Sequence, residues 1–112
     1  MEKNSLGSFE EVVMLTVAVL YNNAYGISIK EEMEKRLGKN VSVGAMRTAL
    51  SRLEKKGYLQ SEMGEATAIR GGKRKRFFKV TPYGARVLQE VMDTRKQLWE
   101  AIPSMALDFK LI

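Results

Sequence analysis

The chain has 112 residues, 45% of them hydrophobic, and a net charge of +6. It fits one domain, and because it contains no cysteine and no histidine we expect no disulfide, no bound metal, no cofactor and no enzymatic activity. The longest near-apolar stretch, residues 12–21, is too short for a bilayer span of roughly 20 residues. The N-terminus does not resemble a signal peptide, so we expect a cytoplasmic protein without a membrane partner.

The first predicted element is a helix over residues 9–21. Ser8 and Glu11 match a capping box, with Ser8 as the N-cap. The valine content also permits a buried strand, but the cap and the length favour a helix. Apolar side chains surround most of it, so it must be buried on more than one side, which a small monomer can hardly achieve. A dimer would cover the sides that carry Val12, Leu15 and Val19.

A turn-rich break at residues 22–26 precedes a short amphipathic helix. Ser28 is its predicted N-cap, and Gly38 is predicted to end it. Its apolar positions recur every four residues, which places Ile29, Met33 and Leu37 on one buried face.

The third helix is predicted to run from the N-cap Ser42 to about residue 56, where Gly57 stops it. Its apolar stripe is formed by Met46, Leu50 and Leu53. Two helices joined by a tight turn, the second with an exposed basic and hydroxyl-bearing face, are typical of a helix-turn-helix. The residues of this helix expected to contact DNA are Ser42, Arg47, Thr48, Ser51, Arg52 and Lys55. Two alternatives stay open, a capping role alone for Ser42 and an acidic partner for Arg52.

A basic hairpin follows, with predicted strands over residues 58–69 and 76–80 and glycines at the tip between them. Six basic residues and no acidic residue lie in residues 70–81, and without these six the chain has 13 basic and 13 acidic residues. Such a cluster on an otherwise balanced chain indicates a polyanionic partner, although a solvated hairpin tip is the alternative. The expected DNA contacts of the hairpin are Lys73, Arg74, Lys75 and Arg76.

Thr81 as N-cap and Pro82 at the first helical position predict a last helix, which Pro103 stops. Its wide apolar stripe has no partner left in its own monomer, so we expect it to pack against a second copy. The expected interface residues are Leu88, Val91, Met92, Leu98, Trp99 and Ile102. Trp99 has a second interpretation, as a wall of a pocket for a small aromatic effector.

Several segments of the chain resemble the PadR family of bacterial regulators. They are Tyr-Gly-Ile-Ser-Ile at 25–29, Val-Ser-Val-Gly-Ala at 41–45, Leu-Ser-Arg-Leu-Glu-Lys-Lys-Gly-Tyr at 50–58, Arg-Gly-Gly-Lys-Arg-Lys-Arg-Phe-Phe at 70–78 and Thr-Pro-Tyr-Gly at 81–84. The resemblance implies a winged-helix dimer, usually a repressor, whose last helix packs across the two-fold axis. Family members usually carry a Tyr, often followed by Pro, early in the recognition helix. This chain has Arg47 and Thr48 there, which points to a phosphate or guanine contact by Arg47.

The sequence therefore predicts a mainly α (α+β) fold, with a winged helix-turn-helix over residues 1–81 and a C-terminal dimerisation helix and tail over residues 82–112. The predicted function is transcription regulation by sequence-specific binding to double-stranded DNA. We expect a repressor that binds a pseudo-palindromic operator as a homodimer and is released by a small effector. The alternative is a non-sequence-specific nucleoid or RNA-binding module, for which Tyr58 and Phe77 are the only aromatic stacking candidates near the basic segment. A module that binds an acidic protein is the third hypothesis.

Overall fold

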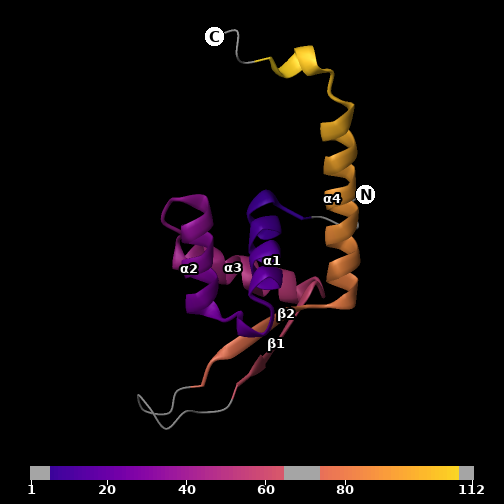
Figure 1. Ribbon diagram of the computed structural model, residues 1–112. Helices are drawn as coiled ribbons and strands as arrows, with labels where there is room; N and C mark the ends of the chain where they lie inside the picture. The colour runs from indigo at the N-terminus through magenta and orange to yellow at the C-terminus, as the bar shows by residue number, and fades with distance from the viewer. Residues whose placement is uncertain (1–5, 65–73, 109–112) are drawn as a thin grey trace.

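The computed structural model describes residues 6–64 and 74–108, and the order of its elements is the predicted one. Three helices, α1 (Ser8–Leu20), α2 (Gly26–Leu37) and α3 (Val43–Lys55), pack around a hairpin of antiparallel strands β1 (Leu59–Met63) and β2 (Arg76–Val80). The last helix, α4 (Pro82–Ala101), leaves this body in one direction and the hairpin leaves it in the other (Figure 1). Short 3-10 turns lie at Tyr21–Asn23 and Ser104–Leu107. This arrangement is a winged helix.

The core lies where the three helices meet the root of the hairpin. The predicted stripes of α2 and α3 are confirmed, because their apolar residues are buried against α1 and β2, except at one position. Leu37 is 41% exposed, so its predicted burial is wrong; it lies in the last turn of α2, where residues 35–40 are all exposed. The buried residues of the core from all elements are Val13, Met14, Val17, Ala24, Ile29, Met33, Val41, Met46, Ala49, Leu50, Leu53, Tyr58, Leu59, Phe78 and Val87.

The N-termini of the first two helices differ from their predicted positions. The N-cap of α1 is Gly7, whose N–H donates to Glu10 Oε1 at 3.0 Å, so the predicted pairing of Ser8 with Glu11 is wrong by one residue. The N-cap of α2 is Tyr25, and Ser28 lies at the third helical position, where its Oγ accepts the Tyr25 N–H at 2.9 Å. In both helices a side chain inside the first turn reaches back to the cap, which is the second half of a capping box.

The other predicted helix boundaries are confirmed. Ser42 Oγ accepts the Ala45 N–H at 3.1 Å at the start of α3, and Thr81 Oγ1 accepts the Gly84 N–H at 2.9 Å at the start of α4. Gly38 ends α2 with a φ of 70°, a left-handed conformation that costs glycine little.

The hairpin pairs Leu59 with Val80 at its root and Met63 with Arg76 at its outer end. β1 ends at Met63 and Gly64 is not part of it, whereas residues 65–69 of the first predicted strand, together with Lys73, lie outside the described residues. A segment before α2 joins the free edge of β2, because the Phe78 N–H donates to the Ala24 carbonyl at 2.8 Å. The hairpin is therefore bonded to the start of the helix-turn-helix as well as to the end of α3.

The root of α4 packs against the start of β1 at very short range. The Tyr58 carbonyl accepts the Thr81 N–H at 3.0 Å, and a Cβ added to Gly84 would lie 2.2 Å from the same oxygen. One turn later Val87, which the sequence analysis did not single out, is buried in the core. The first turns of α4 are thus fixed to the winged helix.

The outer part of α4 has little packed against it. Leu88, Val91 and Met92 are half-buried, whereas Leu98 and Trp99 are 65% and 68% exposed. Arg95, between Met92 and Leu98 in the sequence, forms an ion pair with Glu11 of α1 at 2.8 Å. Within the described ranges, none of the helices combines the length and apolar character that crossing a membrane requires.

The Gly84→Ala substitution is expected to destabilise the protein by about 1–3 kcal/mol, the usual cost of overfilling a packed contact. Its methyl group would collide with the Tyr58 carbonyl, which is backbone and cannot rotate away. Urea unfolding followed by circular dichroism measures the change. Gly26→Ala is the matched control, because a Cβ there has no heavy atom within 4 Å. Equal stability of the two variants would contradict the close approach of α4.

Candidate nucleic-acid interface

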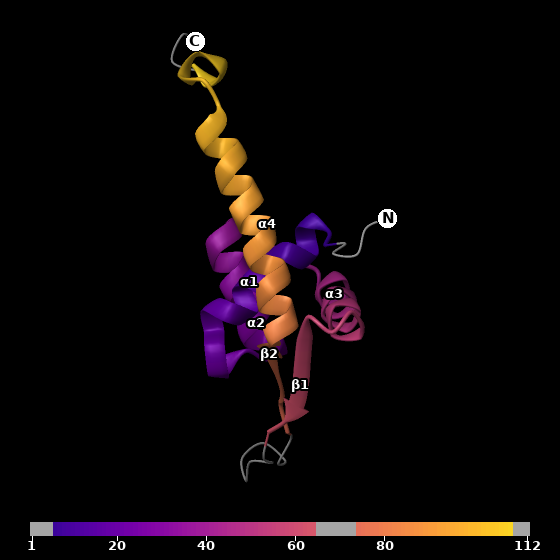
Figure 2. The same cartoon turned by 90° about the vertical axis from the view of Figure 1, so that its right-hand side faces the viewer.

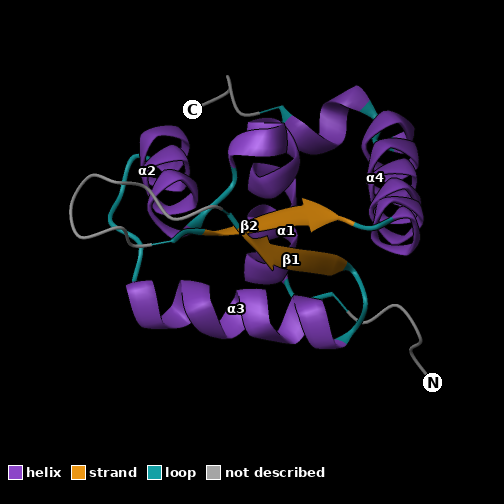
Figure 3. Cartoon of the chain, turned by 90° about the horizontal axis from the view of Figure 1, so that it is seen from below, coloured by secondary structure: helices purple, strands orange, loops and turns teal. Residues whose placement is uncertain are grey.

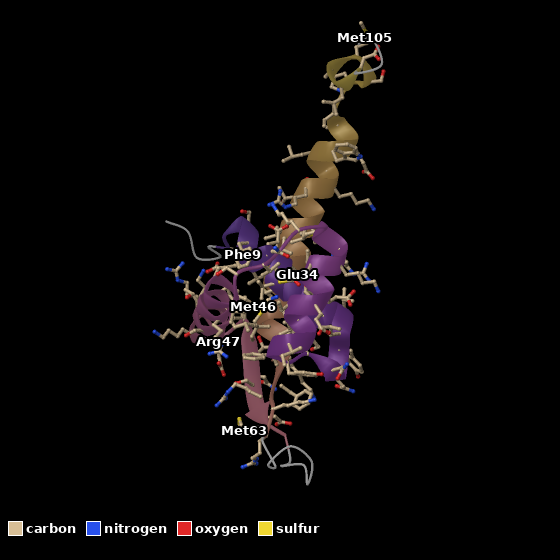
Figure 4. All side chains as sticks on the ribbon, turned by 90° about the vertical axis from the view of Figure 1, so that its left-hand side faces the viewer. Phe9, Glu34, Met46, Arg47, Met63 and Met105 are labelled. Atoms are coloured by element: carbon tan, nitrogen blue, oxygen red, sulfur yellow. The ribbon has the colours of Figure 1, made fainter. Side chains whose placement is uncertain are left out.

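The outer face of α3 carries the predicted DNA contacts. Ser42, Arg47, Thr48, Ser51, Arg52 and Lys55 are all exposed, while Met46, Ala49, Leu50 and Leu53 on the opposite face are buried. Figure 4 shows Arg47 at the outer edge of α3 and Met46, its neighbour in sequence, toward the other helices. Among the residues that the structure describes, Arg47 has no hydrogen-bond or ion-pair partner. Its guanidinium is therefore available to a phosphate or a base edge.

The basic residues that the structure describes at the outer end of the hairpin, residues 74–76, each contact another group of the chain. Arg74 Nε donates to the Gly64 carbonyl at 2.8 Å, and Lys75 Nζ lies 4.2 Å from the centre of the Tyr25 ring. Arg76 Nη1 donates to Ser61 Oγ at 3.0 Å. These contacts limit the freedom of three long side chains, which lowers the entropy that a bound partner must remove.

The Arg76 contact continues to the recognition helix. Ser61 Oγ donates to Glu54 Oε2 at 2.6 Å, so a chain of hydrogen bonds runs from the hairpin through β1 to α3. Glu54 thereby places one carboxylate beside an otherwise cationic surface. This link cannot be predicted from the sequence alone, because Glu54 and Ser61 are ordinary polar residues until the fold brings them together.

The hairpin and α3 meet at a groove of about 470 Å³, which we name the α3–wing groove. Seen from the hairpin end, α3 runs along one side of the sheet (Figure 3), and the view in Figure 2 shows the hairpin extending beyond it. The groove brings together four of the predicted contact residues, Arg47 and Ser51 from α3 and Lys75 and Arg76 from the hairpin. Its other lining residues are Tyr25, Gly26, Ile27, Met46, Leu50, Glu54 and Phe78.

Arg52 lies away from this groove, beside the buried carboxylate of Glu10. Lys56 Nζ forms an ion pair with Glu10 Oε1 at 2.9 Å, and Arg52 adds a second positive charge nearby. Burial raises the pKa of Glu10, but the hydrogen bonds from Lys56 and the Gly7 N–H and the two positive charges outweigh it, so the pKa is lowered from 4.5. The charge of Arg52 thus acts on Glu10 of α1, whose ion pair is with Lys56.

The lowered pKa of Glu10 predicts a specific pH dependence of stability. The unfolded chain binds this proton more readily than the native one, so the stabilisation is present above pH 4.5 and is lost as the pH falls through the lower native pKa. We expect Glu10→Gln, which keeps an acceptor for the Gly7 N–H, to show a smaller loss of unfolding free energy than the wild type between pH 6 and pH 3. Urea titrations at each pH measure this, with Glu31→Gln on the exposed side of α2 as the control. Parallel curves for wild type and Glu10→Gln would contradict the assignment.

The aromatic residues near the basic segment are engaged within the fold. Tyr58 is 2% exposed, and the rings of Phe77 and Tyr25 meet edge-on at 5.4 Å between centroids. Tyr58 cannot stack on a base without leaving the core. The surface therefore supplies cations and hydroxyl groups rather than a row of stacking platforms, which favours a duplex over a single strand.

A winged helix with an exposed cationic α3 and a basic hairpin on one surface defines the class of DNA-binding transcription regulators. Residues 14–90 match the model of the transcriptional regulator PadR-like family. This match covers more than half of the chain, so the chain belongs to the PadR-like family, whose members are transcription regulators and not enzymes. The family resemblance drawn from the sequence is confirmed.

Solved structures support the same assignment. A PadR family transcriptional regulator from Eggerthella lenta is 26% identical, with a TM-score of 0.66 over 87% of this chain and 82% of that one. A PadR-like transcription factor from Bacteroides fragilis is 28% identical, with a TM-score of 0.68 over 82% and 84%. A PadR-like regulator from Bacillus cereus, at 16% identity, shares the fold with a TM-score of 0.71 over 88% and 91%. No curated protein sequence matches the chain.

Proposed function

We propose that this regulator is a repressor that binds a pseudo-palindromic operator as a homodimer. The observation that carries the proposal is the α3–wing groove, where α3 and the hairpin present cationic side chains to one surface. A helix such as α3 fits the major groove, and the hairpin then reaches the flanking phosphates or the minor groove. Two copies related by a two-fold axis would place their α3 helices one helical turn of DNA apart, about 34 Å, or a multiple of it.

Within α3, Arg47 is the residue we assign to sequence readout. It is exposed and has no partner among the described residues, and a guanidinium forms two hydrogen bonds to the edge of a guanine. Four other exposed residues of α3 and its N-cap are assigned to the DNA phosphate backbone, where they fix the position of the helix along the duplex. They are Ser42, Thr48, Ser51 and Lys55. Arg52, beside Glu10, is placed to contact phosphate at most.

Replacing Arg74, Lys75 and Arg76 together by alanine is expected to weaken binding to a duplex selected from a random pool and to reduce its salt dependence. Each lost phosphate contact removes about 0.9 from the slope of log K against log salt concentration, so six contacts in a dimer remove about 5. Fluorescence anisotropy over a salt series measures both quantities. A triple variant at the exposed residues Lys35, Arg86 and Lys96 has the same charge change and is expected to keep most of the slope.

Two results would contradict this proposal. If wild type enriches no palindromic motif, the protein is a non-sequence-specific nucleic-acid binder, the alternative drawn from its composition. If the two triple variants lose affinity equally, binding follows net charge, and the hairpin has no particular role in it.

The exposed end of α4 is the surface we assign to dimerisation. Leu98 and Trp99 near the end of α4 are 65% and 68% exposed, and Met105 in the 3-10 turn that follows is 85% exposed. Exposed large apolar side chains that gather at one end of a molecule commonly mark an interaction surface. The interface would join α1 and α4. Its further residues are the half-buried Val12, Leu15, Leu88, Val91 and Met92 and the exposed Val19. Trp99 also offers a flat face to a small aromatic effector between the two copies.

The Leu98→Glu substitution is expected to raise the dimer dissociation constant at least about 30-fold, the equivalent of about 2 kcal/mol for a central interface residue. The side chain is 65% exposed in the single chain, so the fold itself tolerates the change. Sedimentation equilibrium measures the dissociation constant. Leu37→Glu, at a leucine of α2 that is 41% exposed, is the control. An unchanged dissociation constant in Leu98→Glu would exclude this end of α4 from the interface.

A further inference from the structure

The α3–wing groove is larger and more apolar than contact with a phosphate backbone requires. Its floor is formed by Met46, Leu50 and Phe78, which are 2%, 4% and 8% exposed. Ile27, on the first turn of α2, forms a wall and is 65% exposed, although it lies on a surface that is otherwise charged. The volume of about 470 Å³ falls within the range of roughly 300–1,000 Å³ that is common for small-molecule sites.

The rim of the groove is cationic. Arg47, Lys75 and Arg76 lie around it with one carboxylate, Glu54, which is already engaged by the Ser61 hydroxyl. Arg47 can pair with an incoming anion without breaking a contact to any described residue. Charge-assisted hydrogen bonds from a guanidinium to a carboxylate or sulfonate are among the strongest that a partly exposed site offers. An apolar floor below a positive rim is complementary to a molecule with an apolar body and an anionic group.

We propose that the α3–wing groove binds a small amphipathic anion and that this ligand and DNA exclude one another. The inference rests on the proposed function, because the cations at the rim are those assigned to the operator. Release of DNA then follows from direct competition at each α3. This competition needs no rearrangement of α4. In this respect the site differs from an effector site at Trp99, which would act through the dimer interface. Simple competition makes the apparent dissociation constant for DNA rise linearly with ligand, reaching tenfold at about nine times the ligand's own dissociation constant.

The first test uses 8-anilinonaphthalene-1-sulfonate, an apolar anion whose fluorescence increases when it leaves water. We expect saturable binding of one probe per chain, displaced by decanoate and not by decylamine. Ile27→Ser removes the exposed wall at little risk to the fold and is expected to weaken probe binding at least fivefold. Leu37→Ser, at the other end of the same helix, is the matched control and is expected to bind the probe as wild type does.

The second test measures the dissociation constant of the selected duplex at increasing probe concentration. Ile27→Ser keeps every cation, and its DNA affinity without probe is measured first and serves as its own reference. Relative to that reference, added probe is expected to raise its dissociation constant for DNA less than it raises that of wild type. Probe binding that is unaffected by Ile27→Ser, or a DNA affinity independent of bound probe, overturns the inference. Displacement by decylamine as readily as by decanoate also overturns it. Failure of the proposed function looks different, because then no palindromic motif is enriched from the random pool, or no duplex binds even without probe. The first test still decides whether the groove takes the anion.

Discussion

The Tyr58 carbonyl fixes the positions of α3, the hairpin and α4 relative to one another. It accepts hydrogen bonds from both the N–H and the hydroxyl of Thr81, at 3.0 and 3.2 Å, and Gly84 packs against it without room for a Cβ. Tyr58 follows the end of α3 and precedes β1, so one backbone group connects the recognition helix, the hairpin and the start of α4. The interaction is short-ranged and made of backbone, which leaves little freedom in the direction that α4 takes.

The hairpin is held from its other side by the segment before α2. The bond from Phe78 to the Ala24 carbonyl joins β2 to this segment, and Tyr25 contacts both Phe77 and Lys75. With the link from Arg76 through Ser61 to Glu54, the outer end of the hairpin is connected to both helices of the helix-turn-helix. Lys75 and Arg76 thus lie on a hairpin that is held by contacts on both sides, and these contacts fix their positions relative to α3 in the free protein.

Features that depend on neighbours in sequence could be predicted, and features that depend on distant neighbours could not. Ser42 and Thr81 were identified as caps because each bonds an N–H three residues away. Adjacent glutamates at positions 10 and 11 made the α1 cap ambiguous, and the choice between them depends on Lys56 and Arg95, 46 and 84 residues away along the chain. The exposed face of α3 follows from its periodicity. The groove beside it, with Ile27 as its wall, depends on the pairing of β2 with the segment before α2, which joins residues more than 50 positions apart in the sequence.

A helix fixed at one end acts as a lever. Trp99 lies 15 residues beyond Gly84, which is about 22 Å along the helix axis at 1.5 Å per residue. A tilt of about 10° at the root would therefore move Trp99 by about 4 Å, close to the roughly 3.4 Å rise of one base pair along a DNA strand. In the dimer that we propose, a tilt of this size would put the two α3 helices about one base pair out of step with their half-sites, and the close contact of Gly84 with the Tyr58 carbonyl opposes such a tilt.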